Sequence, residues 1–134
     1  QNTAPDHNSP WVMPGNYTVK LIIDGLDRPN TLVVKMDPRV KTSMQDLQLQ
    51  HDLSLQAYEA RKEIIKLLND NPALRNTPAN SQDITFVRLT AIFGSLHDVM
   101  QDSDMPPTTQ AKNAMKEAIA NFQKLKQLQT NNNQ

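Results

Sequence analysis

Two His-Asp steps are the residues of this sequence best suited to chemistry. They are His51-Asp52 and His97-Asp98. Imidazole and carboxylate groups are common metal ligands, so the two steps together suggest a metal-dependent hydrolase. Such a site needs further ligands from other helices, and the third histidine, His7, lies in a polar N-terminal stretch. Because His51 also falls on an apolar stripe, we expect core or boundary histidines and rank the hydrolase last.

Other acidic residues and motifs give no stronger signal for catalysis. Asp102 and Asp104 in QDSDMPP resemble half of a calcium loop, but the required glycine and terminal glutamate are missing. We expect them to cap a helix or to lie in a solvated turn. The sequence has no GxSxG, P-loop, HExxH or dinucleotide fingerprint. We therefore predict no catalytic residue, no metal ligand and no cofactor.

Composition removes several further classes. The absence of cysteine excludes a disulfide framework, a thiolate metal site and a cysteine nucleophile. Fourteen basic and fourteen acidic residues cancel, so the cationic field expected of a nucleic-acid-binding protein is missing. No apolar run approaches the length of a membrane-spanning helix.

Trp11 and Tyr17 are the only candidates for a binding surface. Trp11 lies in residues 1–16, a proline-rich polar stretch that predicts a disordered or extended lead-in. As the only tryptophan, it is expected to pack on a sheet or a helix. The alternative is a sugar-stacking platform, which would make the chain a glycan- or protein-binding module. Such platforms usually combine several aromatics with polar partners, and the sequence lacks them.

Residues 17–36 predict a β-hairpin. Alternating apolar residues from Tyr17 to Asp24 indicate a strand with one buried face, and Thr31 to Met36 indicate the return strand. We expect the turn between them at residues 25–30, which contain Gly25 and Pro29. Two strands alone are marginally stable in water. The hairpin therefore needs helices over it, or further strands that this chain does not supply.

Residues 41–130 predict three amphipathic helices. Ser43 is the expected cap of the first helix, which runs to about Asn69; Ser81 or Asp83 starts the second, and Thr108 caps the third. The first helix carries two apolar stripes. The first stripe is Met44, Leu47, His51, Leu55, Tyr58, Ile65 and Leu68, and the second is Leu53, Ala57, Ala60, Ile64 and Leu67. The second helix has a seam made of Phe86, Leu89, Phe93, Leu96 and Met100.

Two details complete this expectation. Gly94 inside the seam of the second helix predicts a close helix crossing, and the polar tail TNNNQ predicts a frayed end. The fold class is thus mostly α with a small β part, an N-terminal hairpin followed by an up-down-up three-helix bundle.

Three segments carry a family resemblance. They are PGNYTVKLIIDG (14–25), VVKMDPRVKTSMQDLQLQHDLSLQAYEA (33–60) and RLTAIFGSLHDVMQDSDMPPTTQAKNAM (88–115). Together they resemble the C-terminal region of secreted bacterial proteins with a sortilin-like or BNR-repeat β-propeller, often labelled glycosyl hydrolases. The family pattern corresponds here to Pro14–Val19, Lys35–Val40 and Asp52–Leu55, and to Asp104 with Pro107-Thr108. The sequence departs from it at His51, where an aromatic is expected, and in its Asn/Gln-rich tail.

The resemblance implies a setting within a larger protein. The hairpin would close an immunoglobulin-like domain that follows the propeller, and any hydrolytic residues would lie on the propeller. The chain would be exported, to the periplasm or beyond the cell, as a non-catalytic accessory module. Because the chain begins with Gln1 and a polar stretch, we expect a piece excised from that parent. A homodimer through the free strand edge is a further expectation for the isolated piece.

Overall fold

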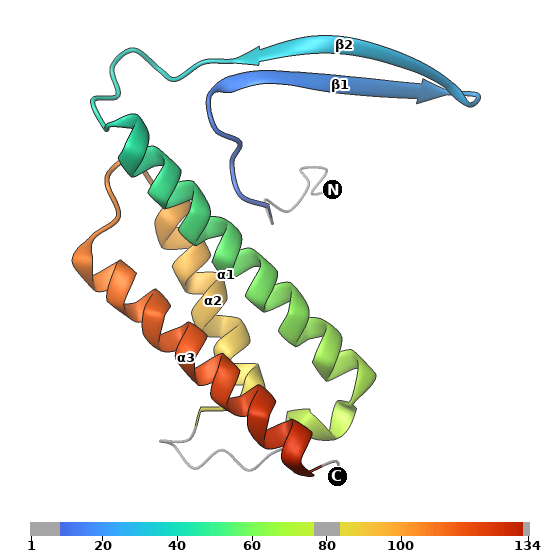
Figure 1. Cartoon of the computed structure of the whole chain (residues 1–134), viewed down its shortest axis with the longest axis vertical. Coiled ribbons are helices and arrows are strands. Elements are labelled where there is room, and N and C mark those ends of the chain that lie inside the picture. The colour runs from blue at the N-terminus through green and yellow to red at the C-terminus, as the bar shows by residue number, and fades with distance from the viewer. Residues whose placement is uncertain (1–8, 77–83, 133–134) are drawn as a thin grey trace, which may run out of the picture.

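A computed structural model describes residues 9–76 and 84–132 of the chain. A two-stranded hairpin is followed by three helices, which confirms the predicted fold class (Figure 1). Each helix runs antiparallel to the one before it along the long axis of the molecule, so that the first and third helices descend and the second rises in the view of Figure 1. The elements in chain order are β1 (Gly15–Ile23), β2 (Leu26–Val34), α1 (Met44–Asp70), the short 3-10 helix η1 (Pro72–Asn76), α2 (Phe86–Gln101) and α3 (Thr109–Asn132).

Hydroxyl caps set where the helices begin. Ser43 caps α1 as predicted, because its Oγ accepts the backbone N–H of Asp46 at 3.1 Å and donates to the Asp46 carboxylate at 2.7 Å. Thr108 caps α3 as predicted, with its Oγ1 3.1 Å from the backbone N of Ala111. The prediction for α2 was wrong. Ser81 and Asp83 lie outside the described residues, and α2 begins at Phe86 after the cap Thr85.

The seam of α2 forms the centre of the core. All five of its predicted members are buried, and Phe93 is fully so. Phe122 of α3 meets Phe86 and Phe93 edge to face, with ring centroids 6.4 and 6.2 Å apart. These contacts join α2 to α3, while α1 packs mainly on α2.

Only one side of α1 is covered. Most of the second stripe is buried or partly buried against the core, whereas Met44, Leu55 and Ile65 of the first stripe are exposed. Three of the seven residues of the first stripe are therefore left uncovered. The physical reason is that α1 packs mainly on one neighbouring helix, which covers an arc narrower than two stripes.

Two further expectations needed correction. A Cβ built on Gly94 would meet the guanidinium of Arg61 at 3.7 Å, so a side chain rather than a helix backbone lies over this glycine. The tail TNNNQ was expected to fray, yet α3 extends to Asn132, and the last two residues of this tail, 133–134, lie outside the described residues.

The hairpin turns earlier than predicted. Asp24 and Gly25 form a two-residue turn with φ of 49° and 78°, the conformation that Asp-Gly favours in hairpins. The expected turn residues 26–30 instead belong to β2, where Pro29 lies opposite Lys20. In an antiparallel pair every second residue directs its N–H outward, so a proline is tolerated there on an edge strand.

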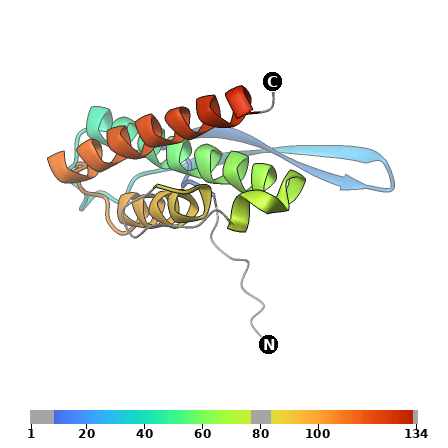
Figure 2. The ribbon, with the colours of Figure 1, turned by 90° about the horizontal axis from the view of Figure 1, so that it is seen from below.

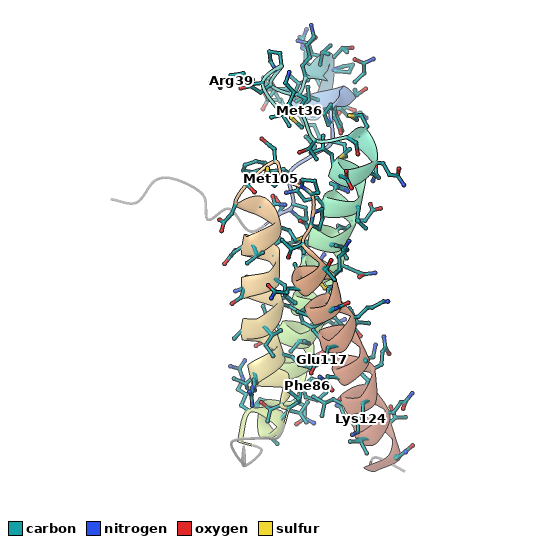
Figure 3. The ribbon with its side chains drawn as sticks, turned by 90° about the vertical axis from the view of Figure 1, so that its left-hand side faces the viewer. Met36, Arg39, Phe86, Met105, Glu117 and Lys124 are labelled. Carbon is teal, nitrogen blue, oxygen red and sulfur yellow. The ribbon has the colours of Figure 1, made fainter. Side chains whose placement is uncertain are left out.

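The hairpin stands beyond one end of the bundle and crosses the helix direction (Figure 1). Seen from below, it reaches past the helices to one side (Figure 2). Figure 3 shows Met36 and Arg39 at this end, in the connection to α1, and Phe86 toward the opposite end. Among the described elements, no helix packs on either strand. The predicted buried face is therefore not buried within the described chain.

Candidate interface on the hairpin

The register of the hairpin places most of its apolar residues on one face, while Ile22 and Val33 lie on the other. Directly paired residues share a face, and Tyr17 pairs with Leu32 while Ile23 pairs with Leu26. We call this side the apolar face of the hairpin. Its apolar members are Tyr17, Val19, Leu21, Ile23, Leu26, Leu32 and Val34.

This face is open to solvent. Leu21 is 58% exposed and Leu26 is 63% exposed, and Val19, Ile23 and Leu32 are also exposed. A shallow hollow runs over it, lined by Val19, Leu21, Leu32 and neighbouring residues of β2. Arg28 and Asn30 share this face, opposite Leu21 and Val19. Exposed apolar side chains gathered on one face are typical of an interaction site.

The opposite face is more polar. Lys20 and Asp27 form an ion pair across the strands, with Nζ and Oδ2 3.0 Å apart. The side chain of Lys20 is 59% exposed and that of Asp27 is 50% exposed, so the ion pair adds little to the stability of the hairpin. Thr18 and Thr31 lie directly opposite one another on this face. The hairpin is thus amphipathic, with an apolar side suited to another protein surface.

Hydrogen bonds anchor the segment before β1. The amide side chain of Gln101, at the end of α2, accepts from the backbone N–H of Trp11 at 2.9 Å and donates to Ser54 Oγ of α1 at 2.8 Å. Because Ser54 is fully buried, this bond satisfies a hydroxyl inside the bundle. One side chain therefore joins the lead-in to two helices.

The segment after β2 is anchored at the same end of the bundle. Thr42 Oγ1 donates to the carbonyl of Asp104, in the α2–α3 loop. Gln50 of α1 donates to the carbonyls of Met100 and Ser103. Both ends of the hairpin are thus tied to the bundle although its strands are not covered by it.

A charged turn lies between β2 and α1. The backbone N–H of Val40 donates to the Asp37 carbonyl at 3.0 Å, and the Arg39 guanidinium donates to the Asp37 carboxylate at 2.6 Å. Hydrogen bonds from the Arg39 side chain and backbone hold the pKa of Asp37 below its ordinary value. The same carboxylate raises the pKa of Arg39.

The two aromatic candidates differ in exposure. Trp11 is 59% exposed, so the prediction that it packs on the sheet or a helix was wrong. Its position follows from its backbone bond to Gln101 rather than from burial of the ring. Tyr17 is partly buried and its hydroxyl donates to the Met13 carbonyl at 2.5 Å. Tyr17 is therefore occupied in holding the lead-in against β1.

The two His-Asp steps are local pairs on separate helices. His51 Nδ1 lies 3.5 Å from Asp52, and His97 Nδ1 lies 3.6 Å from Asp98. His97 is buried and its ring faces Tyr58, with centroids 6.4 Å apart, while His51 is partly exposed. Residues 9–76 and 84–132 contain no group of three or more His, Asp or Glu that could hold a metal ion. His97 thus lies in the core and His51 at its boundary, as expected.

The acidic pair after α2 plays a structural part. Asp102 is the C-cap of α2 and is exposed, while the carbonyl of Asp104 accepts from Thr42. This agrees with the predicted capping or turn role.

Sequence reasoning missed the Ser54–Gln101–Trp11 connection. Ser54 interrupts the apolar stripes of α1, and Gln101 is the first residue of the polar stretch QDSDMPP. The available signal was a small polar residue at a helical position between two stripes, which indicates a buried hydroxyl that needs a partner.

Comparisons with known proteins return no match. No protein-family model, curated protein or solved structure corresponds to this chain. None of the described helices is both long enough and apolar enough to span a membrane.

Proposed function

We propose that this chain is a non-catalytic accessory module of an exported β-propeller protein, in which the hairpin completes the sheet of a neighbouring immunoglobulin-like domain. The observation that carries this proposal is the uncovered apolar face of the hairpin. Two strands alone are marginally stable, so the hairpin gains most by joining a larger sheet. The bundle then acts as a cap and spacer.

The anchoring at the bundle end supports this role. The lead-in and the connection to α1 are both bonded to the bundle, so the hairpin is presented in one orientation. Prior ordering of this kind reduces the entropy lost when a partner binds. The propeller and the immunoglobulin-like domain come from the family resemblance of the sequence.

A second function is favoured by one observation. The exposed ring of Trp11 is free to stack on a sugar or on an apolar side chain of a protein partner. Tyr17 gives a glycan platform little support as a second open ring, because it is partly buried and its hydroxyl is bonded to Met13. Trp11→Ala should abolish binding on a glycan array if this function holds, and leave the hairpin unchanged.

The reading frame upstream of residue 1 tests the main proposal. We expect it to encode a propeller followed by the earlier strands of an immunoglobulin-like domain. The longer protein should then protect the hairpin amides from hydrogen exchange, whereas the 134-residue chain should not. An upstream start codon next to residue 1 contradicts the proposal, as does turnover of aryl glycosides by the 134-residue chain alone.

A matched pair of substitutions sharpens this test in the longer protein. Leu21→Lys places a charge on the apolar face. Ile22→Lys places the same charge one residue further along β1, on the opposite face of the hairpin. We expect Leu21→Lys alone to remove the protection of the hairpin amides. Equal effects of both variants would show that the apolar face is not what docks.

A further inference from the structure

The two edges of the hairpin differ in their capacity to accept another strand. A two-residue turn closes with a hydrogen-bonded pair, here Ile23 and Leu26, and bonded pairs alternate from there. The remaining residues direct their backbone groups outward, to the free edges. These residues are Asn16, Thr18, Lys20 and Ile22 on β1, and Asp27, Pro29, Thr31 and Val33 on β2.

The free edge of β2 lacks donors at its middle. Pro29 has no N–H. The N–H of Thr31 is already donated to the side-chain oxygen of Asn30, at 2.9 Å. Proline and charged residues such as Asp27 and Arg28 are the means by which edge strands avoid pairing with other chains. A new strand on this side would meet two successive positions without an available donor.

The free edge of β1 has no such protection. All four of its outward residues carry a backbone N–H, and among the described residues no side chain accepts a hydrogen bond from any of these N–H groups. Lys20 is the only charged residue of the strand, and its ammonium group is drawn toward Asp27 on β2, away from the free edge of β1. The β1 edge is thus a row of available donors and acceptors beside an apolar face.

We propose that β1 is the docking edge of the hairpin, and that its occupant in the isolated chain is β1 of a second copy, paired antiparallel. The inference rests on the proposed role of the hairpin as an element that joins a sheet. Antiparallel pairing about a two-fold axis through the sheet joins the apolar face of one copy to that of the other. In a register in which Val19 of one copy pairs with Val19 of the other, Lys20 of each copy lies directly opposite Thr18 of its partner copy. Because Lys20 is the only charged residue of β1, no directly paired residues then carry like charges.

β1 is the strand nearer the helices and β2 is the outer strand (Figure 1), so room for this partner lies where the hairpin extends past the bundle. The turn end of the hairpin projects beyond the helices, so the outer part of β1 does not run along the bundle (Figures 1 and 2). Strand addition at this edge extends a two-stranded ribbon to four strands, which exceeds the three strands with an apolar face that a sheet needs for stability in water.

Two proline substitutions test the choice of edge. Thr18 and Thr31 are directly opposite, are both exposed, and direct their N–H groups to opposite edges. Sedimentation equilibrium of the 134-residue chain should show a monomer–dimer equilibrium. We expect Thr18→Pro to weaken the dimer by at least about tenfold, because it removes a central donor, and Thr31→Pro to change it less than about twofold.

Hydrogen exchange of the unsubstituted chain gives a second readout that no folding defect can obscure. On raising the protein concentration, the amides of Thr18 and Lys20 should become slower to exchange, while those of Asp27 and Val33 should not change. A chain that is monomeric at every concentration overturns the proposal. So does a dimer weakened equally by Thr31→Pro, or one in which only Leu21→Lys acts and the β1 amides stay unprotected. The reading-frame test of the proposed function is independent of all these outcomes.

Discussion

The helical bundle and the hairpin use the same kind of apolar pattern with opposite results. The seam of α2 meets α1 and α3, and its five apolar residues are buried. The apolar face of the hairpin carries seven apolar residues on one side, and no described element covers it. Periodicity therefore identifies the face of an element that is suited to burial. It does not show whether the partner that buries this face belongs to the same chain.

The largest expected effect contrasts a seam residue with a hairpin residue. Phe93→Ala should lower the free energy of unfolding of the bundle by about 3–5 kcal/mol, because Phe93 is fully buried. Leu21→Ala should lower it by less than about 0.5 kcal/mol, because its side chain is mostly exposed. Urea unfolding followed by helical circular dichroism measures both. Similar losses for the two variants would mean that the hairpin is packed on the bundle.

The connection between the two regions should give the next effect. Gln101→Ala removes the bonds to Ser54 and to the backbone of Trp11, and leaves a buried hydroxyl without its partner. We expect a loss of about 1–3 kcal/mol of bundle stability and faster hydrogen exchange at the Trp11 amide. Trp11→Ala keeps the backbone bond and is the control. If Gln101→Ala lowers the stability but leaves exchange at the Trp11 amide unchanged, Gln101 does not hold the lead-in of the hairpin.

Helix caps should have a smaller effect, confined to the bundle. Ser43→Ala and Thr108→Ala should each cost about 1 kcal/mol, since each hydroxyl accepts an N–H of the first helical turn. Thr109→Ala is the matched control, because Thr109 is exposed and follows the cap of α3. If Thr109→Ala costs as much as Thr108→Ala, the assigned cap is wrong.

The smallest effect concerns pH and the charged turn. The pKa of Asp37 is lowered in the folded chain, so its contribution is complete above the ordinary value of about 3.8 and is lost as pH falls through the lowered value. A carboxyl carbon NMR titration should show this, and Arg39→Gln should move the pKa back toward the ordinary value. An unchanged pKa in Arg39→Gln would mean that Arg39 is not the cause.

Local rules predicted the elements better than they predicted their coverage. Ser43 and Thr108 were found as caps because a capping hydroxyl acts within its own helical turn. The hairpin turn was placed too late because Pro29 was taken to end the ladder, although an edge strand tolerates it. Asp24-Gly25 was the stronger signal, since both residues can adopt positive φ.

Burial was harder to predict because it depends on which elements meet. Leu55 and Ile65 belong to a regular stripe, yet they lie on the side of α1 that its neighbours leave open. Trp11 was expected inside on the strength of its residue type, but a backbone bond to Gln101 positions it with its ring in solvent. The candidate interface could be located from alternation alone, whereas its openness could only be observed in the folded chain.

Amide hydrogen exchange of the 134-residue chain at low concentration tests the central claim most directly. The claim is that the bundle is stabilised by its own buried seams, while the hairpin is only marginally stable until another strand or surface packs on it. It predicts that the inward amides of β1 and β2 exchange at least about a hundredfold faster than those of the α2 seam. Hairpin amides as slow as the seam amides would contradict it, because the hairpin would then be stable without any further strand.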